Sequence, residues 1–380
     1  MSVVINILLL LLVISVLTFV HELGHFLAAK LVKAKVFDFS IGFGPKLISK
    51  KVGDTTYNLR VLPFGGFVKI LGDGDPTSKK EDVKDEGNLK NKSKIAQIFV
   101  MLAGVTMNVL LAVIFYTIFL AGTGWRLNIS GDYQNFKPVG AEISSERVSD
   151  LPYQLTEDSA AIGSGLFEEG YIKSIDGVKI DNYDEFKNIL ADIKDTTVEI
   201  TSCEIESNLC DVFTVPVDSE GKIGMYIGDN YSIYIDYSNN KIFAGFAHSI
   251  NVVKLTGQVL GNLFSQAKES GDYSTLSNTV SGPVGIYFVI DYFKTLGIFF
   301  FLGIVADLSI SLAIINILPI PALDGGRVMI LLIEGILRKD LNEKVETAII
   351  NISFIFLIIL IIGIMLKDII NIDQLQSWFR

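Results

Sequence analysis

Long apolar runs constrain this chain more than any other feature of its sequence. A helix needs roughly 20 residues to cross ~30 Å of hydrocarbon, and four runs come near this length: Val4–Leu31, Ile95–Gly122, Leu296–Ile317 and Ala348–Leu366. A cleaved signal peptide would start with basic residues. No basic residue precedes Lys30, so we expect the first run to be retained as a helix. The runs predict a polytopic α-helical membrane protein with four transmembrane helices.

Charge predicts how these helices are oriented. Fourteen Lys and Arg residues lie between Lys30 and Lys94, so this loop is expected on the cytoplasmic side. The large segment 123–296, with both termini, is then expected outside, where twelve basic and twenty-five acidic residues give a formal charge of −13. Neither this segment nor the whole chain, at −10, favours nucleic-acid binding.

A metal-binding motif closes the first apolar run, as His21-Glu22-Leu23-Gly24-His25. Residues i and i+4 share one face of a helix, so the two histidines can hold one metal ion, and Glu22 can accept a proton from a water molecule activated by that metal. The alternative is a chance spacing. The third histidine, His248, falls in the outer segment and is expected to be a surface residue.

Two histidines need a third protein ligand, and the candidate is Asp324. It follows two prolines at the end of the third span, on the expected side of His21 and His25. The alternative is that Asp324 caps a following helix that starts near Gly326. In the same span, Asn316 can hold a substrate backbone or an oxyanion, or join two helices. Asp307 has no assigned role.

The segment after the first helix predicts a membrane-associated β-hairpin. Lys46–Leu62 alternates like two strands around a turn at Val52-Gly53-Asp54. The flanking sequence is too apolar for an ordinary loop, so we expect the hairpin to approach the metal motif and Gly65 and Gly66 to bind substrate. The alternative is a surface hairpin. Asp73–Lys94 is highly charged and is expected to form a cytoplasmic loop.

The outer segment predicts one compact α/β domain at about residues 138–228, with a helix near Tyr183–Ala191 between short strands. Cys203 and Cys210 lie on either side of a predicted turn at Glu206-Ser207-Asn208. They either form a cross-strand disulfide or are two free thiols.

Seven segments follow from these patterns. They are residues 1–36 with the first span and the histidine motif, 37–94 with the hairpin and charged loop, 95–122 with the second span, 123–246 with the outer domain, 247–295 as an amphipathic juxtamembrane segment, 296–347 with the third span and a cytoplasmic loop, and 348–380 with the fourth span and tail.

Together these motifs resemble the site-2 protease family of intramembrane zinc metalloproteases, in particular the RseP type. The matching pieces run through nearly the whole chain, in order: His21–His25, Gly42–Pro45, Pro63–Phe67, Ala103-Gly104 with Asn108, and Asn316–Gly326. The resemblance implies that His21, His25 and Asp324 bind one Zn²⁺ and that Glu22 is the catalytic base. It also implies a PDZ-like, extracytoplasmic outer domain.

The resemblance further implies a location in the bacterial inner membrane, with the active site toward the cytoplasm. The expected substrates are single-span membrane proteins such as anti-sigma factors after a first cut by a site-1-type protease, or signal-peptide remnants. Three features depart from the family pattern: there is room for one PDZ-like domain where many RseP-type members have two, Val105 follows Ala103-Gly104, and Arg327 stands where a histidine is frequent. The rival interpretations are a metal transporter and a catalytically silent PDZ scaffold.

Overall fold

A computed structural model describes residues 2–377 except 74–84, 134, 157–158, 160, 192, 206–208 and 229. The expected turn at 206–208 and much of the charged loop therefore lie outside the described residues. The chain folds into two compact units, Met1–Trp125 with Asn240–Arg380, and Arg126–Asn239. Each is described by itself.

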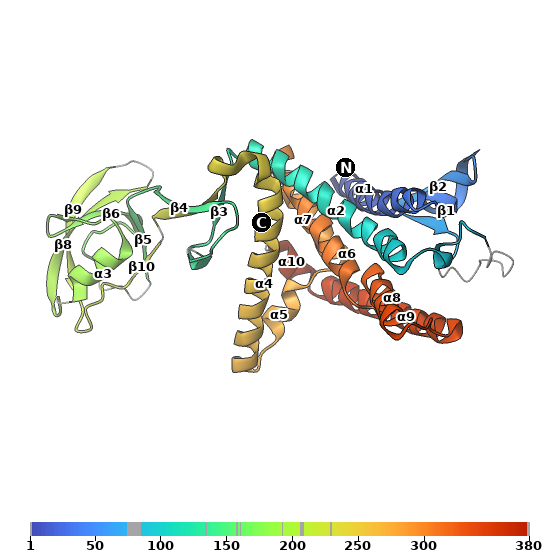
Figure 1. Cartoon of the computed structure of the whole chain (residues 1–380). Coiled ribbons are helices and arrows are strands. Elements are labelled where there is room, and N and C mark those ends of the chain that lie inside the picture. Colours follow the sequence, from blue (N-terminus) through green and yellow to red (C-terminus); the bar gives the residue numbers. More distant parts are fainter. Residues whose placement is uncertain are drawn as a thin grey trace. The chain divides into compact units, whose positions relative to one another are not determined.

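The first unit is a helical bundle with a small β ribbon (Figure 1). Its elements are α1 (Ser2–Leu31), β1 (Val36–Val52), β2 (Thr55–Ile70), α2 (Lys94–Gly122), α4 (Ala244–Ser270), α5 (Ser274–Thr279), α6 (Pro283–Phe293), α7 (Ile298–Ile317), α8 (Asp324–Leu337), α9 (Glu343–Ile370) and α10 (Ile372–Ser377). Among the described residues, α1, α2, α7 and α9 are long and apolar enough to cross a membrane. These are the four spans that the apolar runs predict.

Helix α2 is the centre of this unit, because it contacts α1, α7, α4 and α8 (Figure 1). Small residues allow its close approach to α1. A Cβ atom on Gly24 would lie 2.3 Å from the Ala103 carbonyl oxygen, so only a glycine fits at this crossing. The crossing lies beside the histidine motif and so sets the distance between α1 and α2 at that level.

The β ribbon is more folded than a single hairpin. Val52 pairs with Thr55 across the expected turn, in which Gly53 has φ +60°. Phe39 in β1 pairs both with Tyr57 and with Val68, so the first part of β1 lies between the two ends of β2. The last part of β2 therefore forms an edge of this sheet.

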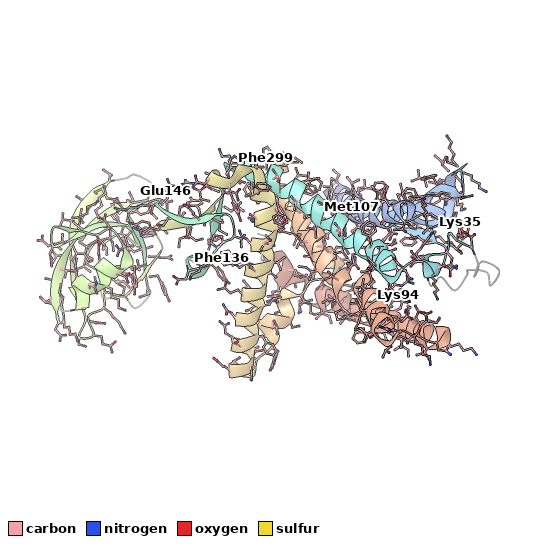
Figure 2. The ribbon with its side chains drawn as sticks, in the orientation of Figure 1. Lys35, Lys94, Met107, Phe136, Glu146 and Phe299 are labelled. Atoms are coloured by element: carbon pink, nitrogen blue, oxygen red, sulfur yellow. A yellow bond between two sulfur atoms is a disulfide. The ribbon has the colours of Figure 1, made fainter. Side chains whose placement is uncertain are left out.

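Lys35 and Lys94 lie at the end of the unit that holds the ribbon, and Phe299 lies at the other end (Figure 2). Lys94, at the start of α2, contacts Glu334 of α8 at 2.6 Å and Asp340 at 2.8 Å. These ion pairs fix α8 against α2.

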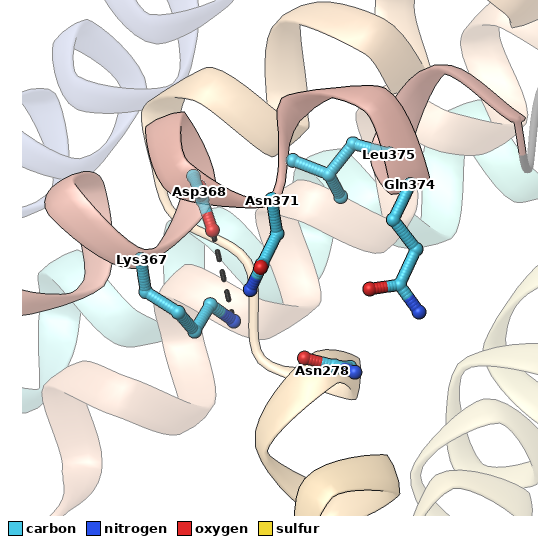
Figure 3. A pocket seen from close by; sticks show the side chains of 6 residues that line it. All are labelled: Asn278, Lys367, Asp368, Asn371, Gln374 and Leu375. Carbon is cyan, nitrogen blue, oxygen red and sulfur yellow. Dashed lines mark ion pairs between the residues drawn. The ribbon is translucent and has the colours of Figure 1, made fainter.

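The far end of α9 is fastened to the start of α6. The Asp368 side chain is fully buried, and its Oδ2 accepts hydrogen bonds from the backbone N–H groups of Gly282 and Gly285, at 2.8 and 3.1 Å. Asp368 thus satisfies orphan donors of the first turn of α6. Lys367 lies 3.7 Å from the other carboxylate oxygen, and both residues line a small pocket between α5, α9 and α10 (Figure 3).

Helix α4 corrects the expectation for His248. This residue is 8% exposed and lies in the buried first part of α4, where its ring meets Tyr116 of α2 edge-on at 4.6 Å. A Cβ atom on Gly245 would lie 2.3 Å from the Val113 carbonyl oxygen, so α4 begins in direct contact with α2. The expectation was wrong because sequence position alone does not show that the helix docks on a span.

The second unit contains two antiparallel sheets and one helix. Its elements are β3 (Arg126–Ile129), β4 (Glu142–Arg147), β5 (Leu151–Leu155), β6 (Glu169–Ile175), β7 (Val178–Lys179), α3 (Tyr183–Ala191), β8 (Thr196–Glu204), β9 (Cys210–Val217), β10 (Met225–Ile227) and β11 (Tyr231–Asp236). The larger sheet has the order β10-β5-β6-β8-β9 with β7 beside β6, and the smaller has the order β3-β11-β4.

The core of the second unit is formed by α3 and the larger sheet, with Ile172, Ile175 and Ile200 fully buried. Cys203 and Cys210 face each other across β8 and β9 and form a disulfide. The arrangement suits one small α/β domain; its likeness to a PDZ domain stays a prediction.

Candidate metal site

Helix α1 places the two motif histidines on one face, one turn apart. Both are nearly buried, with 9% and 8% exposure, and their Nε2 atoms lie 3.2 Å apart. This follows from the helical repeat, which brings residues i and i+4 together. The i, i+4 spacing therefore yields two nitrogen atoms directed at one point.

Asp324 reaches the same point from the junction of α7 and α8. Its Oδ2 atom lies 3.1 Å from Nε2 of His21 and 3.3 Å from Nε2 of His25. The chain reverses direction here and packs closely on itself. A Cβ atom on Gly325 would lie only 2.1 Å from the Ile317 carbonyl oxygen. Helix α8 starts at Asp324, and its N-cap Leu323 makes no side-chain cap bond. The Asp324 carboxylate thus faces the histidines rather than capping the helix.

The three ligand atoms have the spacing of a metal site. Ligands held at ~2.0–2.1 Å in a tetrahedron lie about 3.3 Å apart, and the three separations here are 3.1, 3.2 and 3.3 Å. Oδ2 of Asp324 is buried without a hydrogen-bond donor among the described residues. A cation between these atoms would satisfy it, and two imidazoles with one carboxylate form a donor set that zinc accepts.

A glycine of α2 makes room for the histidine pair. A Cβ atom on Gly104 would lie 2.4 Å from Nε2 of His25 and 2.9 Å from Nε2 of His21. Both distances are shorter than any real Cβ contact, so every larger residue would push the rings out of place. Gly104 is thus a steric requirement of this geometry.

The other ring nitrogens are held by α2. Nδ1 of His25 lies 2.8 Å from the carbonyl oxygen of Val100, which fixes the proton on Nδ1 and leaves Nε2 with a lone pair. Nδ1 of His21 lies 3.2 Å from the Asn108 amide, whose oxygen is buried without a partner among the described residues. An amide turned to place that oxygen at Nδ1 would orient His21 in the same way.

Glu22 lies between the metal-ligand cluster and the β ribbon. Its Oε2 atom accepts a hydrogen bond from the backbone N–H of Val68 at 3.0 Å. Because this N–H points away from β1, the carboxylate sits on the free edge of β2. A proton acceptor, three converging ligand atoms and a strand edge are therefore combined in one place.

The remaining expected site residues are less engaged. Gly65 is buried against Phe43, and Gly66 lies within van der Waals reach of Glu22, since its Cβ would be 3.8 Å from Glu22 Cγ. Asn316 lies in the last turn of α7 and is half-buried, and its amide has no hydrogen bond to another described residue. The geometry brings Gly66 to Glu22 and leaves the substrate-binding role of all three as predictions.

Sequence reasoning missed the partners of the polar residues within the spans. Asp307, which had no assigned role, accepts a hydrogen bond from the Tyr116 hydroxyl at 2.5 Å. Ser309 donates to the Asn108 carbonyl oxygen at 2.8 Å. The only signal in the sequence is that a polar side chain in an apolar span needs a partner, which does not say which residue that partner is.

The sequence profile of peptidase family M50 matches residues 9–360 of this chain. The chain belongs to peptidase family M50. A Clostridium perfringens protein named as a zinc metalloprotease is 35% identical over 364 residues, which are 95% of this chain and 97% of that protein.

Two relatives carry a more specific name. The zinc metalloprotease RasP of Shouchella clausii is 29% identical over 94% of this M50 chain and 97% of that protein. The regulator of sigma-W protease RasP of Bacillus subtilis is 27% identical over 94% of this chain and 96% of that protein. This M50 peptidase is therefore a zinc metalloendopeptidase of the site-2 protease family.

Proposed function

We propose that this M50 peptidase hydrolyses peptide bonds within the transmembrane segments of single-span membrane proteins. The observation that carries the proposal is the position of Glu22. Glu22 directly follows the proposed ligand His21, and its carboxylate bonds to the free edge of a strand. The 19 residues of α1 before His21 are apolar except for a few small polar side chains. A site of this kind on a membrane-spanning helix acts on chains that are in the membrane.

His21, His25 and Asp324 are the proposed ligands of one zinc ion. Zinc bound there would lower the pKa of water and polarise a carbonyl group. Glu22 would accept the proton of the attacking water and deliver it to the leaving amine. Its bond to Val68 leaves Oε2 oriented and holds the carboxylate on the substrate side of the site.

The edge of β2 is the proposed substrate-binding surface. A peptide carbonyl within a helix is shielded, so the substrate must unwind before it is cut. An unwound segment can add to a sheet edge through main-chain hydrogen bonds. The N–H of Val68 points outward from this edge to Glu22, and in a regular ladder the N–H of Gly66, two residues earlier, also points outward. Gly65, Gly66 and Asn316 are assigned to holding the substrate backbone here.

The proposed setting is regulated proteolysis in the bacterial inner membrane. The name of the Bacillus subtilis relative, a regulator of sigma-W protease, supports substrates of the anti-sigma-factor kind, cut first by a site-1-type protease, with signal-peptide remnants as a second class. The fourteen Lys and Arg residues between Lys30 and Lys94, the segment that holds the β ribbon, support a cytoplasmic position for the active site. Both termini and the PDZ-like domain are then extracytoplasmic.

Replacing Glu22→Gln tests this function directly. The full chain, reconstituted in vesicles with a model single-span substrate, is assayed for cleavage and for zinc content per chain. We expect the variant to keep its zinc and to lose about 10²- to 10⁴-fold in rate, which is the usual effect of removing a general base.

The matched control is Glu86→Gln, which alters an exposed glutamate near the ribbon. It should cleave as the wild type does. A zinc-loaded Glu22→Gln protein with the wild-type rate contradicts the proposed mechanism. A wild-type protein that transports zinc and cleaves nothing supports the transporter interpretation instead.

A further inference from the structure

An ion pair connects the β ribbon to the helix that carries the third proposed ligand. Nη1 of Arg327 lies 2.6 Å from Oδ1 of Asp73, and Nη2 donates to the Asp73 backbone carbonyl oxygen. The two side chains are 25% and 22% exposed, so both are largely withdrawn from water. A guanidinium that contacts one residue through two nitrogens holds both its distance and its direction.

Arg327 belongs to the first turn of α8, three residues after Asp324. Residues three apart lie on neighbouring positions of one helix face. The turn before α8 packs closely against the first turn of this helix: a Cβ atom on Gly326 would lie 2.1 Å from the Ile320 carbonyl oxygen. The first turn of α8 therefore has little freedom to adjust. A displacement of the Arg327 side chain would move this turn, and Asp324 with it.

Asp73 lies three residues after the end of β2, in a segment held by backbone hydrogen bonds. Leu71 donates a backbone hydrogen bond to Lys35 at 2.9 Å, and Leu89 donates one to Leu71 at 2.8 Å. A Cβ atom on Gly72 would overlap the side chain of Asn88, which shows how closely this turn is packed. The same strand end, at Val68, holds Glu22.

Burial raises the pKa of the Asp73 carboxyl group, and the neighbouring Arg327 guanidinium partly offsets that rise. Neither residue offers an atom to the proposed metal site, whose ligand atoms come from His21, His25 and Asp324.

We propose that Asp73 and Arg327 are positioning residues, whose ion pair fixes the first turn of α8 to the end of β2 and so sets Asp324 against His21, His25 and Glu22. The proposal rests on the roles assigned above to Asp324 and Glu22. The ion pair is a direct polar link between the turn after β2 and the first turn of α8.

The test is zinc affinity, measured by chelator competition on the purified full chain. Groups that orient a metal ligand commonly contribute 10- to 100-fold to affinity or activity, so we expect Arg327→Ala to raise the zinc dissociation constant by about that factor. We expect kcat to fall similarly, with KM changed little, because the substrate edge of β2 is retained. Arg327→Lys keeps the charge but loses the second nitrogen, and should recover part of both losses.

A double-mutant cycle separates the pair from its surroundings. Asp73→Ala added to Arg327→Ala should cause little further loss of zinc affinity. The control is Glu334→Gln, which removes a different ion pair of the same helix. It should lower thermal stability without changing zinc affinity.

The proposal is overturned if Arg327→Ala binds zinc like the wild type, if the two alanine effects are additive, or if Glu334→Gln weakens zinc binding equally. A failure of the proposed function can be distinguished from a failure of the positioning role, because zinc affinity is measured without a substrate. If Glu22→Gln cleaves normally while Arg327→Ala weakens zinc binding, the positioning role stands and the assigned catalytic role of Glu22 falls.

Discussion

Asn108 contacts the ring nitrogen of His21 that points away from the proposed metal site, with 3.2 Å between the amide and Nδ1. Its backbone carbonyl accepts the hydroxyl of Ser309. Three apolar helices, α1, α2 and α7, therefore meet around one buried amide that is fully shielded from solvent. The direction of the His21 ring depends on residues that lie far from it in the sequence.

Asn108→Ala should weaken zinc binding without unfolding the bundle. Loss of a partner that orients a histidine ligand costs about 10- to 100-fold in metal affinity. Chelator competition measures this on the purified protein. Asn351→Ala removes an exposed amide from α9 and serves as the control. Equal zinc affinity in the wild type and in Asn108→Ala would show that the contact has no orienting role.

Gly104→Ala should displace the histidines. The added Cβ atom would lie 2.4 Å from Nε2 of His25, and overpacking of this kind costs about 1–3 kcal/mol. We expect zinc affinity to fall by at least about tenfold, read by metal analysis after dialysis. Gly363→Ala, on a span where a Cβ atom meets nothing within 4 Å, should retain its zinc. If both variants retain zinc, the close packing at Gly104 is not required.

Tyr116→Phe should destabilise the bundle, because it leaves the half-buried Asp307 carboxyl without its donor. A group left unsatisfied in this way costs about 1–3 kcal/mol. Replacing both partners with apolar residues is milder, so Tyr116→Phe combined with Asp307→Leu should recover part of the loss. Unfolding by denaturing detergent in mixed micelles gives the free energies. A double variant less stable than Tyr116→Phe would refute this account.

The burial of His248 predicts a pH-dependent stability. Burial lowers the pKa of His248 from 6.5 to about 4. As the pH falls from 6.5 toward 4, His248 becomes protonated in the unfolded chain but stays neutral in the folded chain. The free energy of unfolding therefore falls through this window by up to about 3 kcal/mol.

His248→Phe keeps an aromatic ring against Tyr116 and removes the titrating group. It should lose less stability than the wild type between pH 7 and pH 5, measured as the shift of the melting temperature in detergent. All other ionisable groups are present in both proteins and cancel in the comparison. Parallel pH dependences in the two proteins would be inconsistent with a buried, neutral His248.

The sequence predicted features that depend on local pattern. Apolar runs of sufficient length became α1, α2, α7 and α9, and the i, i+4 spacing of His21 and His25 was enough to pair their nitrogens. Asp324 was predictable because a carboxylate between helix-breaking residues at a membrane boundary needs a reason to be there. These inferences use length, spacing and the cost of polarity in an apolar span.

Contacts between distant segments were beyond the sequence. Glu22 meets Val68 and Arg327 meets Asp73 because the ribbon folds back on itself and on α8. No periodicity encodes such pairs. His248 was assigned to the surface for the same reason: the docking of α4 on α2 depends on how Gly245 fits against Val113, which appears only in three dimensions.

The central claim is that this M50 peptidase cuts inside the membrane, and the position of the cut tests it most directly. A purified single-span substrate is incubated in vesicles with the wild type and with Glu22→Gln, and both product ends are identified by mass spectrometry. The account predicts one new carboxyl end and its matching amino end within the apolar span of the substrate, formed only by the wild type. Cleavage confined to the aqueous flanks of the span, or identical products from both proteins, would contradict it.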